Sequence, residues 1–393
     1  MADAVAERAV IADPAEVGID AGALAELIAR CRREVDDGLL PSCQMAVAAN
    51  DRLVAYETFG DAAPDSRYVI FSCTKAVVAG AFWLLLGQGA ISLDQRVAEV
   101  IPEFATHGKD VITVRQLLLH EGGFPQAPMN LEQDRTREQR LARFATWRLN
   151  WEPGTRFEYH PTSAHWVIAE LIERLSGVEY RRFVHEAVLD PLGLTRLRLG
   201  VPPADQGDIN DLEVRGEPAT NEELEAVLGI PGVTLEMMQG EVTEAALLAF
   251  NRPEIREIGV PGGGGISTAA DLAFYYQALL HNTKGLWDPA VLASGTREVH
   301  GVLPDQWFHV SSNRAFGTVI AGEGGDAALR GFGRTVSPNT FGHAGAGGQI
   351  AFADPDVDVS FCYLTNGLDA NTLREGRRTS GIASRVGPLT GHP

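Results

Sequence analysis

Residues 72–89 read SCTKAVVAGAFWLLLGQG, and they constrain the fold more than any other stretch of the chain. They are apolar on nearly every side of a helix, which is typical of a helix buried in a core. Gly87 and Gly89 indicate where this helix ends. Ser72 stands at its start, and Lys75 follows three residues later on the same face. The stretch therefore predicts a buried helix whose first turn carries two chemically active side chains.

The residues before this helix predict a helix followed by an antiparallel hairpin. Apolar residues recur at helical spacing over residues 20–35, and Asp20 is suited to cap the start. Two strands are expected at residues 44–49 and 52–59, joined by a tight turn at Asn50-Asp51. A helix followed by a hairpin indicates an α+β fold rather than a doubly wound sheet.

The middle of the chain, from residue 93 to about residue 259, is dominated by helical patterns. They are expected at residues 114–120, 136–147, 162–175 and 180–188. Residues 200–240 are polar and loop-like, and we interpret them as an insertion near the functional site.

Beyond the glycine run 262–265, strand and helix patterns alternate again. A helix is expected at residues 268–281, strands at 316–321, 349–353 and 359–365, and a last helix at 371–385. We therefore predict one discontinuous α/β domain, residues 1–92 and 258–393, with a mainly helical inserted domain, residues 93–257.

Composition narrows the class of partner. The chain has 33 Lys and Arg against 52 Asp and Glu, a formal charge of −19 that disfavours nucleic acid and anionic membranes. No stretch of 18 apolar residues and no signal-peptide pattern is apparent, and four scattered cysteines suggest neither a metal site nor a disulfide framework. We expect a cytoplasmic protein that acts on a small molecule and needs no metal or cofactor.

The pair Ser72 and Lys75 forms an S-x-x-K motif. A serine hydroxyl becomes a nucleophile only when a base accepts its proton. A lysine in apolar surroundings has its charged form disfavoured, so it can serve as that base. The alternative is structural, with Ser72 capping the helix and Lys75 extending to solvent. The motif alone leaves both interpretations open.

Two further motifs accompany this one along the chain. Residues 151–161 read WEPGTRFEYHP and contain Tyr159, and residues 341–348 read FGHAGAGG and contain His343. Together the three resemble the serine β-lactamase and penicillin-binding-protein superfamily in its class C-like esterase branch, the family VIII carboxylesterases. The resemblance spans roughly residues 41–366. It implies a β-lactamase/transpeptidase-like α+β fold, an antiparallel sheet flanked by helices, with an inserted helical domain.

The resemblance also implies a role for each matching residue. Ser72 is expected to be the acylated nucleophile, Lys75 to keep the serine–tyrosine network polarised, and Tyr159 to take the serine proton or return one to the leaving group. The backbone N–H groups of Ser72 and Ala346 are expected to form an oxyanion hole. The residues expected to bind substrate are His343, Gly345 and Ala346.

Two departures from the family pattern bear on the substrate. Pro161 stands where many members have an asparagine that helps to hold a β-lactam amide, and His343 replaces a lysine that meets the substrate carboxylate. A neutral or partly charged imidazole binds an anion less well than an ammonium group does. Both departures favour esters over β-lactams. Without the family order, Tyr159 reads as a buried core tyrosine and His343 as a capped turn residue.

We therefore predict a serine hydrolase that forms an acyl-enzyme on Ser72 and acts on small carboxylic esters. The alternatives within this mechanism are an acyltransferase, a β-lactamase, and a hydrolase of D-amino-acid peptides or cyclic amides. An alternative of another class is a catalytically silent ligand-binding protein, although such a protein has no evident reason to keep a lysine in an apolar helix. The oligomeric state is open, with a homo-oligomer among the options.

Overall fold

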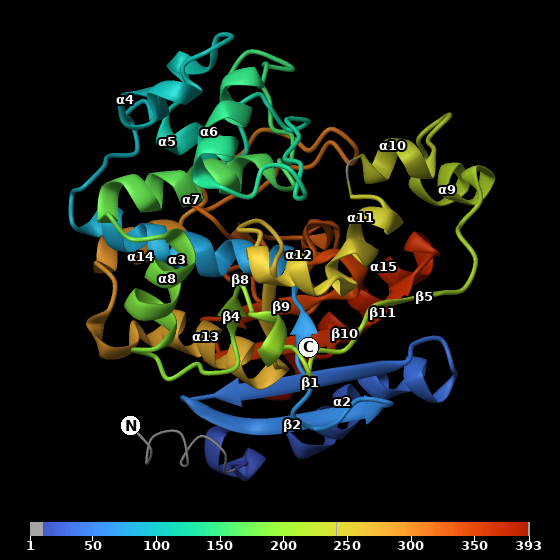
Figure 1. Ribbon diagram of the computed structural model, residues 1–393. Coiled ribbons are helices and arrows are strands. Elements are labelled where there is room, and N and C mark those ends of the chain that lie inside the picture. Colours follow the sequence, from blue (N-terminus) through green and yellow to red (C-terminus); the bar gives the residue numbers. More distant parts are fainter. Residues whose placement is uncertain (1–10, 241, 392–393) are drawn as a thin grey trace.

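A six-stranded antiparallel sheet organises the fold. The computed structural model describes residues 11–240 and 242–391, and its main sheet has the strand order β2-β1-β10-β9-β8-β7 (Figure 1). The strands are β1 (Ser42–Ala49), β2 (Arg52–Gly60), β7 (Val319–Ile320), β8 (Phe341–Gly342), β9 (Ile350–Asp354) and β10 (Val359–Thr365). Because β1 pairs with β10, Cys43 opposite Thr365, segments from both ends of the chain share one sheet.

The hairpin between β1 and β2 forms where the sequence predicts it. Asn50 and Asp51 have φ angles of 51° and 57°, the left-handed pair that a two-residue hairpin turn requires. Successive β1 side chains then alternate between the two faces of the sheet. Met45 and Val47 join one apolar core, and Ala46 and Ala48 join the other. All of β1 is buried because both faces are covered.

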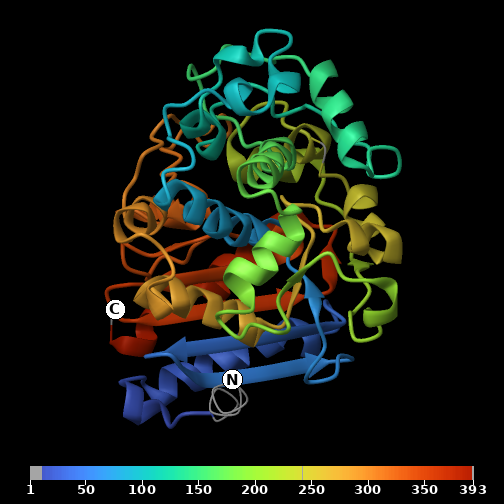
Figure 2. The same cartoon turned by 60° about the vertical axis from the view of Figure 1, so that its left-hand side comes forward.

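Helices cover the two faces of the sheet. On one face lie α2 (Ala21–Asp36) and α15 (Thr372–Ala383), and on the other lies α13 (Ala269–His281), with α3 (Thr74–Gly87) in the layer beyond (Figure 2). The Asp20 side chain accepts a hydrogen bond from the Ala23 backbone N–H at 2.7 Å, so the predicted cap of α2 is confirmed. The α+β class, an antiparallel sheet flanked by helices, is also confirmed.

On the far side of α3 from the sheet lie α4 (Val97–Val100), α5 (Val114–Leu118), α6 (Arg137–Thr146) and α7 (Ser163–Ser176) (Figure 1). The other helices are α8 (Tyr180–Val184), α9 (Asn221–Leu228), α10 (Leu235–Gln239), α11 (Glu244–Leu248), α12 (Pro253–Ile258) and α14 (Pro289–Thr296). Two small sheets join distant segments, namely β3 (Tyr68–Val69) with β6 (Gly265–Ser267) and β4 (Arg198–Leu199), and β5 (Glu213–Arg215) with β11 (Gly367–Asp369). The division into domains 1–92 with 258–393 and 93–257 stays a prediction.

The segment 200–240 differs from its predicted loop. It contains α9 and α10, and α9 begins at a capping box in which Thr220 and Glu223 bond to each other's backbone N–H groups. A small apolar cluster around Ala219, Leu224 and Val233 holds these helices. The sequence did not predict these helices because they bury only this small cluster and therefore lack the full apolar stripe that indicates a helix. The predicted strand 316–321 is shorter as well, and only β7 forms.

The four cysteines form no disulfide bond in the described part of the chain. Cys31, Cys43, Cys73 and Cys362 are all buried free thiols. Across the described residues, no helix is both long and apolar enough to span a bilayer.

Candidate active site

Ser72 lies at the point where a short irregular turn enters the buried helix α3. The turn is the 3-10 helix Phe71–Cys73, and Phe71 has a φ of 42°. A bulky side chain in the left-handed region is strained, and such strain persists where packing enforces it. The Phe71 ring meets the Phe250 ring edge-on at 5.6 Å, and Phe71 is buried. Packing of Phe71 therefore orients the neighbouring Ser72.

Lys75 is completely buried, and its side-chain nitrogen lies beside the serine. Lys75 Nζ is 3.1 Å from Ser72 Oγ, 2.7 Å from the Pro161 carbonyl oxygen and 2.6 Å from the Gly262 carbonyl oxygen. A neutral amine has two N–H bonds and one lone pair. With its N–H bonds directed at the two carbonyls, its lone pair can take the Ser72 proton. The structural alternative for Lys75, extension to solvent, is wrong.

Tyr159 lies between Arg314 and Lys75, which becomes cationic once it has taken the Ser72 proton. Its ring centroid is 4.9 Å from Lys75 Nζ and 5.2 Å from the guanidinium carbon of Arg314. Positive charge beside a phenol favours its ionised form. Burial lowers the pKa of Arg314, and the proximity of Tyr159 opposes this effect. The arrangement can move a proton between the phenol and its neighbours.

Buried histidines hold the Tyr159 segment in place. His120 Nδ1 accepts a hydrogen bond from the His160 backbone N–H at 3.0 Å, which gives His120 a structural role. His160 Nδ1 lies 2.6 Å from the Glu158 carbonyl oxygen, while His160 Nε2 accepts from the Phe124 backbone N–H at 3.1 Å. This pattern requires a neutral imidazole. Burial lowers the pKa of His160 to about 3, and it lowers the pKa of His120 strongly as well.

The backbone N–H groups of Ser72 and Ala346 are both available for an acceptor. Ser72 and Ala346 lie in the first turns of the 3-10 helices Phe71–Cys73 and Ala346–Gly348, where N–H groups lack partners within the helix. Within residues 11–240 and 242–391, neither group donates a hydrogen bond. Gly345 brings the two turns together, since a Cβ atom placed on it would lie 2.6 Å from the Ile70 carbonyl oxygen.

His343 lies behind Tyr159 rather than on the surface of the cleft. Its ring centroid is 5.9 Å from that of Tyr159, its Nδ1 is 2.7 Å from the Ala344 carbonyl oxygen, and its Nε2 is 3.4 Å from Arg314 Nη1. Burial, then Arg314 and Lys75, lower the pKa of His343 well below its usual value, so the imidazole is neutral. Its predicted contact with substrate, like that of Gly345, stays a prediction.

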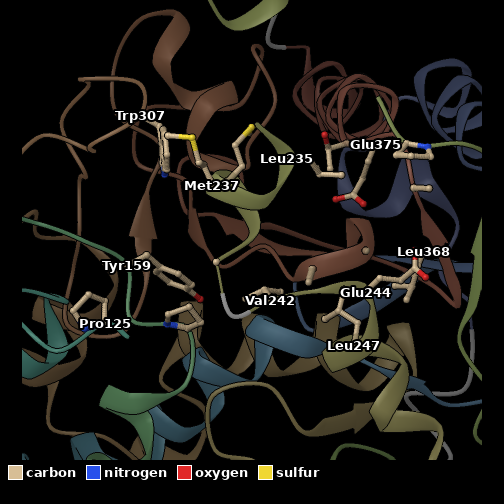
Figure 3. Close-up of a pocket in the computed structure, with 18 of the residues that line it drawn as sticks. Pro125, Tyr159, Leu235, Met237, Val242, Glu244, Leu247, Trp307, Leu368 and Glu375 are labelled. Atoms are coloured by element: carbon tan, nitrogen blue, oxygen red, sulfur yellow. The ribbon is translucent and has the colours of Figure 1, made fainter. Parts of the chain in front are cut away.

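A cleft of about 810 Å³ opens beside Tyr159 (Figure 3). It reaches Pro161, whose carbonyl accepts from Lys75, and the turn at Ala346 and Gly347. Its far wall comes from residues 235–240 and 242–247, the loop 305–307, β11 and α15. The placement of segment 200–240 near the site is confirmed in part, because Pro218, Leu235 and Met237 line the cleft. The described residues contain no group of three or more His, Cys, Asp or Glu side chains arranged to hold a metal ion.

Two features of the site escaped prediction from the sequence. Arg314 lies in an irregular segment and belongs to no motif, so only the folded chain brings it to Tyr159. Glu375, which lines the cleft from α15, sits in a helix that the sequence predicts without assigning it a role.

The fold and this arrangement of serine, buried lysine and tyrosine define a serine hydrolase of the S-x-x-K type. The chain belongs to the beta-lactamase family, whose model matches residues 27–383. It is similar to an esterase/beta-lactamase, LipL, of Mycobacterium tuberculosis, with 28% identity over 77% of this chain and 70% of that one. The structure is similar to a penicillin-binding protein homologue from Caulobacter crescentus, with a TM-score of 0.74, 25% identity and coverage of 93% and 99%. It also resembles a family VIII carboxylesterase, with a TM-score of 0.71, 23% identity and coverage of 94% and 98%. The predicted family and its β-lactamase/transpeptidase-like fold are confirmed.

Proposed function

We propose that the protein hydrolyses small carboxylic esters through an acyl-enzyme on Ser72. The observation that carries the proposal is the 3.1 Å contact between Lys75 Nζ and Ser72 Oγ, next to two N–H groups that have no acceptor among the described residues. A base within hydrogen-bond reach of the nucleophile and donors aimed at a developing oxyanion are the two requirements of acyl transfer.

The reaction proceeds in two steps. Ser72 Oγ attacks the ester carbonyl while its proton passes to Lys75, and the N–H groups of Ser72 and Ala346 stabilise the oxyanion. The tetrahedral intermediate then collapses, the C–O bond to the alcohol breaks, and Tyr159 returns a proton to the leaving oxygen. In the second step a water molecule loses a proton to the same pair and attacks the acyl carbon. Ser72 leaves with a proton, and the free acid is released.

The nature of the cleft supports esters over β-lactams. A β-lactam antibiotic carries a carboxylate, and the cleft wall offers acidic side chains rather than a cation to meet it. The similarity to an esterase/beta-lactamase supports ester chemistry as well. Acyl transfer to an alcohol or amine uses the same first step, and product analysis with and without an acceptor nucleophile separates it from hydrolysis. A cytoplasmic location stays a prediction.

The test is intact mass spectrometry after mixing the protein with p-nitrophenyl butyrate, followed by nitrocefin on the same sample. We expect a transient butyryl adduct on Ser72 with steady release of nitrophenol, and little nitrocefin turnover. Ser72→Ala should lose both adduct and turnover while remaining folded by circular dichroism. Unchanged turnover in Ser72→Ala would rule out the mechanism.

Absence of both adduct and turnover in folded wild-type protein calls for a second reagent. A serine-reactive phosphonate labels an active Ser72 regardless of the acyl specificity of the site. Stoichiometric labelling would then indicate a narrower substrate range, whereas absence of labelling would favour the silent ligand-binding protein.

A further inference from the structure

The cleft beyond Tyr159 is acidic on an apolar background. Its apolar side chains include Leu235, Met237, Leu247, Trp307 and Leu368 (Figure 3). Every charged residue among the described lining residues is acidic, namely Glu158, Glu244, Asp305, Asp369 and Glu375. Lys75 and Arg314 lie deeper, against the Tyr159 ring, and do not belong to this lining.

Three of these acidic residues already have partners in the fold. Glu158 accepts from the Trp151 indole N–H at 2.9 Å, and Asp305 accepts from the backbone N–H groups of Trp307 and Phe308. Asp369 is fully buried between two arginines on α15, which bind it at 2.6 and 3.0 Å. These three carboxylates are held by the protein and need no ligand.

Glu375 differs because its carboxylate faces the cleft without a partner. In the described part of the chain, no hydrogen bond or ion pair involves its side chain, although most of its surface is buried. Arg378, one turn further along α15, is bonded to Asp369 instead. Burial raises the pKa of Glu375 to about 7, Arg378 lowers it and Asp369 raises it further. A mostly buried carboxylate without a partner is costly, and a bound cation would remove that cost.

The position of Glu375 places this carboxylate close to the reacting carbonyl. A Cβ atom placed on Gly348 would lie 3.5 Å from Glu375 Cγ. Gly348 is two residues beyond Ala346, whose N–H faces the oxyanion, and two residues span at most about 7 Å. A short chain therefore suffices to join an ester carbonyl at Ala346 to a charged group at Glu375.

We propose that Glu375 determines substrate specificity by binding a cationic group of the ester, a protonated or quaternary amine. The inference rests on the proposed ester hydrolysis and names its substrate class. The apolar side chains around the cleft would contact the carbon chain of the ester, and the acidic wall would exclude anionic esters.

The test uses two esters of equal shape that differ in charge. They are 4-nitrophenyl 4-(trimethylammonio)butanoate and 4-nitrophenyl 5,5-dimethylhexanoate, in which a tert-butyl group replaces trimethylammonium. For wild type we expect kcat/KM to be about tenfold higher for the cationic ester, the equivalent of one partly buried charge pair. In Glu375→Gln this ratio should fall to about one. Glu244→Gln, which removes a more exposed carboxylate of the same cleft, should retain the preference.

The wild-type protein also provides a test without any variant at the subsite. The quaternary ammonium keeps its charge at every pH, so the ratio between the two esters reports the charge on the protein. The preference should decline as pH falls through about 7, where Glu375 becomes protonated. The pH dependence of the catalytic groups cancels in the ratio. A ratio that is constant between pH 8 and pH 6 would contradict the assignment to Glu375.

Binding measured without turnover separates this proposal from ester hydrolysis itself. Calorimetry with Ser72→Ala and Ser72→Ala/Glu375→Gln should give about tenfold tighter binding of the cationic ester in the first protein only. Equal affinities for the two esters in Ser72→Ala would overturn the subsite, whatever the turnover. A binding preference in a wild-type protein that turns over neither ester would refute only the proposed hydrolysis. Loss of the preference in Glu244→Gln but not in Glu375→Gln would move the subsite to Glu244 and overturn the proposal.

Discussion

The chain buries two lysines completely, in two regions that serve different purposes. Lys75 lies at the start of α3 with its Nζ near the Ser72 hydroxyl and two carbonyls. Lys109 lies in the short 3-10 helix Lys109–Val111, with its Nζ 2.7 Å from the Thr106 carbonyl oxygen and 2.6 Å from that of Trp147. Both side-chain nitrogens also lie near a hydroxyl and a ring, since Lys109 Nζ is 3.0 Å from Thr106 Oγ1 and 5.3 Å from the Phe104 ring centroid. Only the ring beside Lys75, that of Tyr159, belongs to the lining of the cleft.

This comparison weakens the argument that a buried lysine by itself indicates catalysis. An apolar setting around Lys75 was expected to argue against a silent binding protein, because burying a charge is costly. Lys109 shows that the same chain buries a second lysine beside the Thr106 and Trp147 carbonyls, apart from the candidate site. Burial of a lysine is therefore weak evidence for catalysis. The evidence comes from where the lysine lies, here between Ser72 Oγ and the ring of Tyr159, which lines the cleft.

The largest expected effect separates the two lysines directly. Lys75→Met should reduce kcat/KM for a neutral nitrophenyl ester by at least about two orders of magnitude, the scale of general-base catalysis. Lys109→Met, the matched control, should lower the free energy of unfolding but leave the rate of the folded protein unchanged. Rates and urea unfolding of both variants test this pair. A similar rate loss in both variants would show that burial itself, rather than contact with Ser72, matters.

Tyr159→Phe is expected to have an effect of similar or slightly smaller size. It removes the hydroxyl that we propose returns a proton to the leaving group, so we expect a loss of roughly 10²-fold in kcat. Tyr275→Phe is the control, since the Tyr275 hydroxyl donates to the Ala76 carbonyl on α3 at 2.9 Å and lies away from the cleft lining. An alcohol of lower pKa needs less protonation on leaving. The loss in Tyr159→Phe should therefore be smaller for nitrophenyl esters than for alkyl esters, and equal losses would contradict the role in leaving-group protonation.

A smaller effect is expected from the second cation beside Tyr159. Arg314→Met removes a guanidinium 5.2 Å from the Tyr159 ring, so the phenolate loses stabilisation. We expect about a tenfold lower kcat/KM at neutral pH and a pH–rate profile displaced to higher pH. Arg297, whose guanidinium carbon lies 5.9 Å from the Phe341 ring, provides the control Arg297→Met. Loss of rate without displacement of the profile would assign Arg314 a purely structural role.

Local signals in the sequence sufficed for the elements that position the nucleophile. The all-round apolar pattern of residues 74–87 predicts α3, and the three-residue spacing predicts that Lys75 reaches Ser72. The Asn50-Asp51 turn and the Asp20 cap were also predictable, because each depends on the backbone preferences of one or two residues. The approach of Tyr159 to Lys75, in contrast, followed only from the family resemblance, since no local pattern relates residues so far apart.

The parts that could not be predicted depend on tertiary contacts. Arg314 reaches Tyr159 from an irregular segment, and Glu375 reaches the cleft from α15, next to Gly348. The helices α9 and α10 are a different case. Their capping residues Thr220 and Thr234 were visible in the sequence, but their polar faces resemble a loop when only composition is considered.

The smallest effect concerns stability in mild acid and the buried histidines of the reaction centre. Burial lowers the pKa of His120, His160, His165 and His343, so the folded protein binds fewer protons than the unfolded chain, in which histidine has a pKa of about 6.5. Their contribution to stability is therefore complete above about pH 6.5 and declines as pH falls toward the folded values. Each histidine can lower the free energy of unfolding by up to about 1.4 kcal/mol per pH unit in this range.

A second effect opposes this loss of stability at low pH. The chain has a net charge of −19, so the repulsion between its carboxylates weakens as the protein gains protons. The comparison of variants isolates the histidines from that background. His160→Gln should reduce the pH slope of unfolding by about one proton relative to wild type, even if the variant is less stable at pH 7. His309→Gln, at an exposed position, should leave the slope unchanged. Urea unfolding at pH 7, 6 and 5 measures the slopes, and identical slopes in wild type and His160→Gln would show that His160 is protonated in the folded protein.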